Sequence, residues 1–359
     1  MKTWQTKKLG EIISLEYGKS LTERIRVSGN IPVYGSSGLV GTHNAKLVDG
    51  PGIIVGRKGS IGEVVWSDND FWPIDTTYYV RLLQDNKLKY IYFLLQTLKL
   101  NLLNRASGVP GLNRNDVYQI IVKLAPLNIQ VQIIEKLDAI RKLQELNDKE
   151  LEKAGELFDS LLIKLFQPQA TWNRKRLGEI VQLINGRAFK PSEWKSMGIP
   201  IIRIQNLNNS EASFNYYAGK FDDKHLVRNG DLLFSWSGNL GTSFGAFIWD
   251  REDGLLNQHI YKIQIKDKDI LKKYLYFILT SLVKNIEKRT HGAIGLVHIT
   301  KLELEKTMIC YPEPQIQQDI INKLMAVRRY IDTYQIKKSK LSELFESTLN
   351  KAMKGELVN

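Results

Sequence analysis

Two short segments carry residue types that bind phosphate groups in many proteins. "YGKS" (17–20) has the Gly-Lys-Ser ending of a phosphate-binding loop, and "GRKGSIG" (56–62) resembles a glycine-rich nucleotide loop. A phosphate loop needs another glycine five positions before Gly18, and Ile13 stands there. The second segment lacks a strand–loop–helix context, so we expect a tight turn between strands, where glycine supplies a positive φ. The sequence therefore does not support nucleotide binding.

Catalytic groups are also missing from the sequence. An amino-methyltransferase needs an Asn/Asp-Pro-Pro-aromatic motif, and none is present. No cluster of carboxylates stands near a lysine at the spacing that nucleases use. Five scattered histidines and the lone Cys310 give no zinc pattern. We therefore expect a protein without catalysis, metal or cofactor of its own.

Loops in both halves of the chain carry side chains that suit DNA. Lys and Arg bind phosphates, Arg pairs with guanine, and Asn and Gln pair with adenine. In the first half we predict DNA contacts from Ser36, Ser37, Arg57, Lys58, Arg105, Asn113 and Arg114. In the second half we predict them from Arg187, Lys190, Arg203, Gln205, Asn206, Trp236, Ser237, Asn239, Arg289, His291 and His298. The prediction depends on the set, since each residue alone also fits an ordinary turn.

The charge distribution supports a polyanionic partner. The net charge is +13 over 359 residues. Residues 1–126 carry 16 Lys/Arg against 10 Asp/Glu, and residues 172–312 carry 21 against 14. The segment 127–171 is slightly acidic, with 6 against 8. Two basic bodies therefore alternate with two nearly neutral segments, as expected of a nucleic-acid-binding protein.

Composition indicates an ordinary globular protein with room for two or more domains. No run of about 18 apolar residues occurs, so we expect no membrane span. The first residues, "MKTWQTKKLGEI", lack the apolar core of a signal peptide. A single cysteine cannot form an internal disulfide, which fits a reducing cytoplasm. We expect a cytoplasmic protein.

The chain repeats itself. "WQTKKLGEI" (4–12) returns as "WNRKRLGEI" (172–180), and "IIVGRKGSIG" (53–62) corresponds to "LLFSWSGNLG" (232–241). Further pairs keep the same order: Gly18 with Gly186, Gly108, Gly111 and Leu112 with Gly292, Gly295 and Leu296, Pro126 with Pro312, and Ile129-Gln130 with Ile316-Gln317. This order indicates a tandem duplication of a unit of about 180 residues. Loop residues differ where the framework matches, so we expect two bodies that recognise different half-sites.

Each body is followed by a seven-residue repeat. Apolar residues recur at alternating steps of four and three, which predicts long helices that supercoil together. The predicted seam comprises Ile133, Leu137, Ile140, Leu151, Phe158, Leu161 and Leu165, then Ile320, Leu324, Val327, Ile331, Leu341 and Phe345. Polar residues Gln144, Asn147 and Lys338 share the seam, and we expect them to fix its register. We expect antiparallel packing of the two helices, with separate docking on the bodies as the alternative.

The basic bodies have the pattern of mixed α/β domains. Short β-type runs such as "GIIVG" (52–56) alternate with Gly, Asn and Asp turns. Helices are predicted at 88–104 and 273–288, where apolar residues recur at three- and four-residue spacing. The fold class is thus α/β (α+β), with two globular domains separated by two long helices. The predicted boundaries are 1–126, 127–168, 169–312 and 313–359.

On these residues the chain resembles the specificity subunit of type I restriction-modification systems. The match lies in "LGEI", in the G-x-x-G segments 59–62 and 238–241, in "SGVPGLN" and "THGAIGLV", and in the ending "KAMKGEL". The spacer entries "PLNIQVQIIEKL" and "PEPQIQQDIINKL" add to it, although the Glu-Gln step that is usual in the family is absent. The order of all these segments, twice over, covers essentially the whole chain.

The resemblance implies two target-recognition domains for double-stranded DNA, held apart by an antiparallel coiled coil of fixed length. It also implies two modification subunits that use S-adenosylmethionine to methylate adenine N6, and restriction subunits that use ATP and Mg. Three alternatives stay open: the recognition subunit of a type IIB-like enzyme, a stand-alone regulatory or architectural DNA-binding protein, and a coiled-coil scaffold that ignores DNA.

Overall fold

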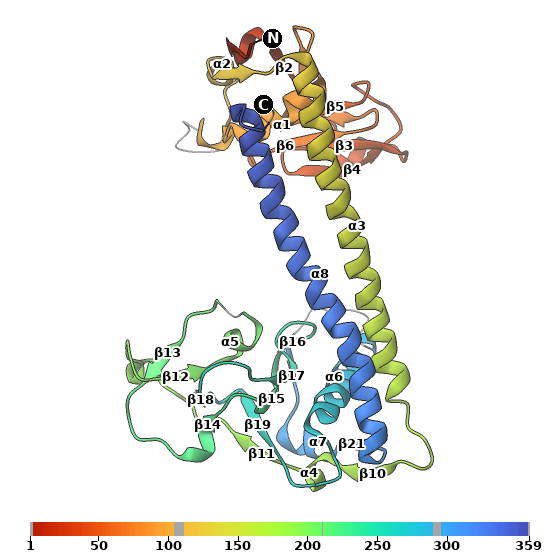
Figure 1. Ribbon diagram of the computed structural model, residues 1–359, viewed down its shortest axis with the longest axis vertical. Helices are drawn as coiled ribbons and strands as arrows, with labels where there is room; N and C mark the ends of the chain where they lie inside the picture. Colours follow the sequence, from red (N-terminus) through yellow and green to blue (C-terminus); the bar gives the residue numbers. More distant parts are fainter. Residues whose placement is uncertain (1–2, 104–110, 210, 290–295, 358–359) are drawn as a thin grey trace. The chain divides into compact units, whose positions relative to one another are not determined.

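The computed structural model describes residues 3–103, 111–209, 211–289 and 296–357. They form two compact units, the first of Met1–Asp148 with Ile336–Asn359 and the second of Lys149–Gln335 (Figure 1). Each unit combines one globular body with parts of two long helices, α3 (Leu127–Leu165) and α8 (Pro314–Lys354). The compact units cut across both helices, whereas the boundaries predicted from the sequence place each long helix in a segment of its own, and those boundaries stay a prediction.

The first body is built around an antiparallel sheet of four strands in the order β2-β8-β5-β6. A second sheet has the order β4-β3-β7, with β3 and β7 parallel, and β1 pairs with β9. The elements in chain order are β1 (Gln5–Lys8), η1 (Leu9–Glu11), β2 (Ile13–Tyr17), η2 (Glu23–Ile25), β3 (Ile31–Gly35), β4 (Gly38–His43), β5 (Gly52–Gly56), β6 (Val64–Ser67), β7 (Trp72–Pro73), β8 (Thr77–Leu82), α1 (Leu88–Thr97), η3 (Leu100–Leu103), α2 (Arg114–Tyr118) and β9 (Ile121–Leu124).

The second body repeats this plan. Its main sheet has the order β11-β19-β15-β17, and its second sheet β13-β12-β18-β14 keeps one parallel pair, β12 with β18. The elements are β10 (Asn173–Arg176), α4 (Leu177–Ile180), β11 (Val181–Asn185), η4 (Pro191–Glu193), β12 (Ile199–Ile202), α5 (Ile204–Asn208), β13 (Asn215–Tyr217), η5 (Asp223–His225), β14 (Leu226–Val227), β15 (Leu232–Ser235), β16 (Ser237–Asn239), β17 (Gly245–Ile248), β18 (Gly254–Leu256), β19 (Ile260–Ile265), α6 (Lys272–Arg289), β20 (Leu296–His298), α7 (Lys301–Lys306) and β21 (Met308–Tyr311). The duplication seen in the sequence is therefore a duplication of topology.

The helix that follows each main sheet is the centre of its unit. Every residue from Tyr90 to Leu95 in α1 is buried, because the sheet covers one side and the long helices cover the other. A helix that is apolar all round requires such an enclosed place. The matching segment of α6 lies in the second core, with Tyr274 fully buried. This explains why "YIYFLL" and "YLYFIL" are so similar in the two halves.

The first of these helices is shorter than predicted. The pattern predicts a helix over 88–104, but α1 ends at Thr97 and a 3₁₀ turn, η3, takes up Leu100–Leu103. Lys99 has a φ of +46°, and a residue in the left-handed region cannot continue a right-handed helix. The second prediction, 273–288, agrees with α6.

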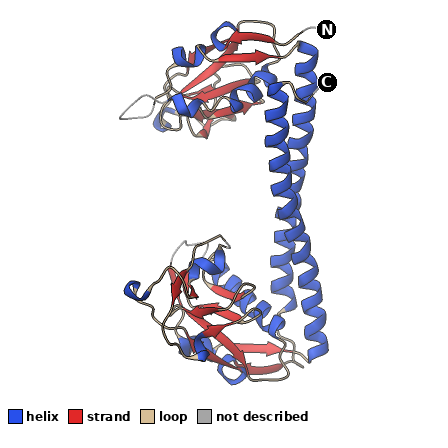
Figure 2. Cartoon of the chain, turned by 60° about the vertical axis from the view of Figure 1, so that its left-hand side comes forward, coloured by secondary structure: helices blue, strands red, loops and turns tan. Residues whose placement is uncertain are grey.

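The two long helices pack antiparallel within each unit. In the first unit Gln144 donates to Leu341 O at 3.4 Å, and Lys338 Nζ lies 2.9 Å from Asp148 Oδ1. Positions later in α3 thus meet positions earlier in α8. In the second unit Tyr330 donates to Glu150 at 3.0 Å. Figure 2 shows both helices beside the strands of each body, so they pack on the bodies as well as on each other.

Burial follows the predicted seam. Its apolar residues are all buried or half-buried, and Asn147 is 1% exposed. Lys338 departs from the pattern, because its side chain is 57% exposed and forms the ion pair with Asp148. Among the described residues, no helix is both long and apolar enough to cross a membrane.

A buried glutamine joins each long helix to its body. Gln130 accepts from Lys87 N and donates to Asn86 and to Ala125 O, at 2.8 to 2.9 Å. Gln317 likewise accepts from Leu271 N and donates to backbone oxygens in the second unit. Each amide therefore holds the start of the body's central helix against the start of the long helix.

Candidate nucleic-acid interface

The turn between β5 and β6 carries two of the predicted DNA contacts. The backbone N–H groups of Arg57 and Lys58 both donate to Thr76 O, at 2.9 and 3.1 Å. Gly59 and Gly62 have φ values of +76° and +73°, as predicted for a turn between strands. Lys58 is exposed and Arg57 is half-buried. The turn therefore holds two cations on a fixed backbone.

The hairpin between β3 and β4 lies next to this turn. Ser36 and Ser37 form its tip, and Ser37 is exposed. A Cβ built on Gly59 would lie 3.5 Å from Ser36 Oγ. Residues more than 20 positions apart in the sequence are thus gathered at one edge of the first body.

Two of the predicted arginines share one aromatic ring. The guanidinium carbons of Arg57 and Arg114 lie 5.0 and 4.9 Å from the centre of the Tyr17 ring. Tyr78 lies beside Tyr17, with ring centres 5.1 Å apart, and donates to Leu112 O at 3.0 Å. Burial, and then the neighbouring Tyr17, raises the pKa of Tyr78. This Tyr-Arg cluster (Tyr17, Tyr78, Arg57 and Arg114) places two cations at the sheet edge.

The structure gives less support to the remaining two predicted contacts of the first body, Asn113 and Arg105. Asn113 is exposed, but its side-chain oxygen accepts from Asn115 N at 2.9 Å and caps α2. Its amide oxygen is therefore already used by the fold. Arg105 lies outside the described residues.

Trp236 is the structural counterpart of Arg57. Its N–H donates to His259 O at 3.2 Å, and its carbonyl accepts from Ile299 N at 3.1 Å. Arg57 makes the corresponding two backbone hydrogen bonds: its N–H donates to Thr76 O at 2.9 Å, and its carbonyl accepts from Leu112 N at 2.8 Å. The same backbone position thus carries a guanidinium in one body and an indole in the other.

Aromatic and histidine rings surround Trp236. Its ring centre lies 6.0 Å from Tyr261 in a stacked arrangement, 5.1 Å from His259 and 5.9 Å from His298. Its Nε1 donates to Gln258 O at 3.1 Å. The second body therefore presents a group of aromatic and histidine rings at the edge where the first body presents arginines.

Two predicted neighbours of Trp236 differ in accessibility. Asn239 is exposed, whereas Ser237 is only 7% exposed and its Oγ lies 3.5 Å from Nε2 of the exposed His298. Ser237 is thus better placed to orient His298 than to contact a ligand. Arg289 is the last residue of α6, and His291 lies outside the described residues.

The structure also corrects the register of the duplication in this region. The sequence pairs Gly111 with Gly295, but the β-bridges pair Lys58 with Gly111 and Ser237 with His298. Gly111 therefore corresponds to His298, three residues further along. The helix caps agree, because Asn113 and Thr300 each start the next helix at this new offset. The counterpart of Arg114 is then Lys301.

A second group of basic residues lies in the second body. The guanidinium carbon of Arg187 lies 4.8 and 4.7 Å from the ring centres of Phe189 and Tyr217, and the side chain forms an ion pair with Glu193. The hydrogen bond with Tyr217, together with the Glu193 charge, raises the pKa of Arg187. Lys190 is exposed at the start of η4. Arg187 is thus a partly neutralised cation, and Lys190 is the more accessible one.

The segment 203–206 is mostly framework. Arg203 lies 5.2 Å from the Trp194 ring and donates to Asn215 Oδ1 at 3.1 Å. Asn206 is fully buried, and its amide bonds the backbone at Arg203 N and Ala212 O. Its position argues against the predicted contact with a base, because no part of the amide reaches the surface. Gln205 is exposed.

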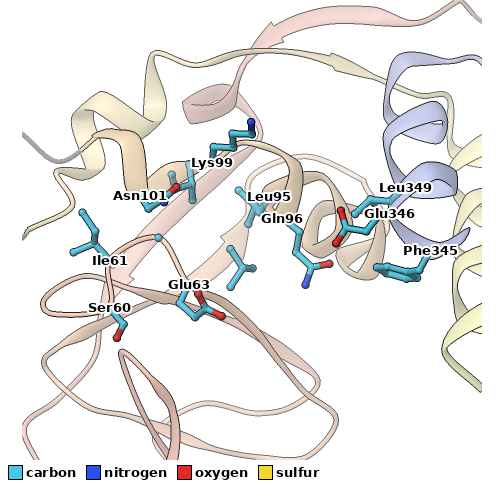
Figure 3. Close-up of a pocket in the computed structure, with 13 residues that line it drawn as sticks. Ser60, Ile61, Glu63, Leu95, Gln96, Lys99, Asn101, Phe345, Glu346 and Leu349 are labelled. Carbon is cyan, nitrogen blue, oxygen red and sulfur yellow. The ribbon is translucent and has the colours of Figure 1, made fainter. Parts of the chain in front are cut away.

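A pocket of about 510 Å³ lies behind the β5–β6 turn (Figure 3). The turn lines it through Ser60 and Glu63, and α8 lines it through Phe345 and Glu346. Among the described residues, no three His, Cys, Asp or Glu side chains are grouped as metal ligands. The pocket thus lies between the β5–β6 turn and α8.

The sequence did not single out the rings that organise these surfaces. Tyr17, Tyr78, His259 and Tyr261 become neighbours of the turns through the register of β2 with β8 and of β11 and β15 with β19. Tyr17 and Tyr78 stand in runs that are far apart in the sequence, so no local pattern brought them together.

Comparison with known proteins identifies the family. Residues 1–154 and 169–346 match the family described as "Type I restriction modification DNA specificity domain". The EcoDI specificity subunit of Escherichia coli is 23% identical over 99% of this chain and 88% of its own length. The EcoBI specificity subunit of Escherichia coli is 26% identical over 56% of this chain, but the match spans only 43% of that protein.

Solved structures show the same fold. The S subunit of a type I restriction-modification system from M. genitalium superposes with a TM-score of 0.64 at 17% identity, over 98% of this chain and 96% of that one. A chain from a structural study of type I assembly also gives 0.64, at 16% identity over 99% of both chains. The chain belongs to the type I restriction-modification DNA specificity family, with the specificity domain present twice.

Proposed function

We propose that this chain supplies the DNA sequence specificity of a type I restriction-modification enzyme. One observation supports this above the others: two bodies with the same topology carry different side chains at the same backbone position, Arg57 in one and Trp236 in the other. A shared framework with different contact residues suits two half-sites of different sequence. The basic charge of both bodies supplies the attraction to phosphates.

In this proposal each body recognises one half of a bipartite site, and the long helices set the gap. Helices α3 and α8 have 39 and 41 residues, which correspond to lengths of about 58 and 62 Å at the usual rise of 1.5 Å per residue. A helix of fixed length predicts a gap with a fixed number of base pairs, as half-site spacing follows geometry in other DNA-binding proteins.

The chain itself performs no chemistry in this proposal. Two modification subunits bind it, bring S-adenosylmethionine and methylate adenine N6, and restriction subunits add ATP- and Mg-dependent cleavage. The duplicated topology offers two equivalent surfaces to two identical partners. Such a complex works on genomic DNA in the cytoplasm.

The test is the genome-wide pattern of N6-methyladenine in the host, with and without this gene. The proposal predicts a two-part motif with a fixed gap that is methylated only when the gene is present. A methylation pattern that does not change on deletion would contradict it. Adding the gene back on a plasmid controls for effects on neighbouring genes.

A further inference from the structure

Arg57 has an unusual environment for a half-buried arginine. Hydrogen bonds at its backbone N–H and its carbonyl fix the main chain of Arg57. Its guanidinium carbon lies 5.0 Å from the centre of the Tyr17 ring and 5.9 Å from that of the Tyr78 ring. Within the described residues, Arg57 Nε is a buried donor without a hydrogen-bond partner. A buried donor left without a partner costs free energy, so the site favours a ligand that accepts hydrogen bonds.

Arg114 strengthens the preference of this site for a ligand that accepts hydrogen bonds. Its guanidinium lies 4.9 Å from the same Tyr17 ring and donates to Leu15 O at 3.3 Å. The two like charges that share this ring repel each other. Arg114 is tied to the backbone, whereas no such bond holds the Arg57 side chain.

We infer that Arg57 recognises a guanine in the half-site of the first body, with Tyr17 as the platform that orients its guanidinium. This inference rests on the proposed function and names the base that this position recognises. Guanine presents two acceptors, O6 and N7, in the major groove, and the planar guanidinium matches both. Stacking on an aromatic ring restricts the side chain before DNA arrives and lowers the entropy lost on binding.

The second body does not recognise guanine through this position. The counterparts of Arg57 and Arg114 are Trp236 and Lys301, and strand pairing places Asn185 where Tyr17 stands. None of the three is an arginine. The contact is therefore confined to one half of the bipartite site.

The experiment uses the chain purified in complex with its modification partner and a duplex that carries the methylation motif. Each guanine of the motif is replaced in turn by 7-deazaguanine, which lacks the N7 acceptor. We expect one position, in one half-site, to weaken binding to the unmodified protein by about tenfold or more, within the range of discrimination of a bidentate contact. The same replacement has no further effect on Arg57→Ala, and it has a smaller effect on Arg57→Lys than on the unmodified protein, because the lysine keeps the charge without the planar group.

Two further variants separate base recognition from other roles. Lys58→Ala, in the same turn, weakens binding to all sequences alike, as expected of a phosphate contact. Tyr17→Phe keeps the ring and the guanine discrimination, whereas Tyr17→Leu loses the discrimination. If Tyr17 had only a structural role, the loss of guanine discrimination would not depend on whether an aromatic ring is kept.

The outcomes distinguish a failure of the proposed function from a failure of the inference about Arg57. If the complex methylates no motif, the proposed function fails and this inference with it. If a motif exists but 7-deazaguanine affects Arg57→Ala as strongly as the unmodified protein, only the inference is overturned. Equal loss on every sequence would make Arg57 a phosphate contact and would also overturn it.

Discussion

At the scale of single residues, side chains that look equivalent in the sequence have very different roles. Asn113, Asn206 and Gln205 are all amides in loops of basic bodies, and each was a reasonable candidate to contact adenine. In the structure one caps a helix, one is fully buried in its loop, and one is exposed. The sequence could not separate them, because burial and capping depend on where the backbone N–H groups lie.

The buried Gln130 gives a first prediction. Gln130→Leu leaves Lys87 N–H and Ala125 C=O without their partner, and each unmet buried group costs about 1–3 kcal/mol. We therefore expect a loss of about 3 kcal/mol in the free energy of unfolding of the first unit, measured by urea denaturation. Gln132→Leu, at an exposed position of the same helix, is the control. Equal losses in the two variants would refute this role of the buried amide.

Asp267 gives a prediction on pH. Hydrogen bonds from Lys175 and then Tyr311, at 2.6 and 2.7 Å, lower the pKa of Asp267 to about 2. Its ordinary value is about 3.9, so the ionised form stabilises the folded state above about pH 4, and this contribution is lost as the pH falls towards 2. Asp267→Asn should be less stable at neutral pH and should lose less stability between pH 4 and pH 2. Parallel curves for the two proteins in that range would contradict this.

At the scale of elements, the sequence was most informative where a period was long. The heptad steps predicted both long helices and their seam, and the duplication predicted that the bodies share one topology. The end of α1 was missed, because a single residue in the left-handed conformation, Lys99, leaves no mark on hydrophobic spacing. The register of the glycine-rich loops was also missed by three residues, since short glycine motifs align in more than one way.

The turn between β5 and β6 gives a prediction at this scale. Gly62 has a φ of +73°, and a Cβ there would lie 2.5 Å from Asn101 N. We expect Gly62→Ala to cost about 1–3 kcal/mol through backbone strain alone, and more through the clash. Gly111→Ala is the matched control, because a Cβ there meets nothing within 4 Å. Thermal unfolding of both variants measures the difference, and similar melting temperatures would count against the strained turn.

The helix seam gives another prediction on stability. Leu137, a residue of α3, is fully buried against α8 and the first body. Leu137→Ala should therefore destabilise the first unit by about 2–5 kcal/mol. Leu143, on the same helix, is 46% exposed, and Leu143→Ala should cost less than about 1 kcal/mol. Urea denaturation of the two variants tests the seam assignment, which fails if Leu143→Ala is the more damaging change.

At the scale of the whole molecule, charge and duplication predicted a DNA-binding protein with two recognition bodies, and the family match agrees with this. The contact residues were only partly predictable. Arg57 and Arg114 were found as cations in loops, but the Tyr17 ring that brings them together follows from strand register, which no local pattern specifies.

Electrostatics at this scale predicts a strong dependence on salt. A protein that neutralises six or more phosphates loses about a thousandfold in affinity between 50 mM and 200 mM salt. We expect this loss for the assembled complex on its motif, and a slope lower by about one for Lys58→Ala. Binding that does not change with salt would favour the coiled-coil scaffold that ignores DNA.

The most direct test of the central claim is an exchange of one body. Residues 1–126 are replaced by the corresponding body of a relative, and the methylated motif of the host is read genome-wide. If each body recognises one half-site and the helices set the gap, one half of the motif changes while the other half and the gap stay the same. A change in both halves, or a change in the gap alone, would contradict the account.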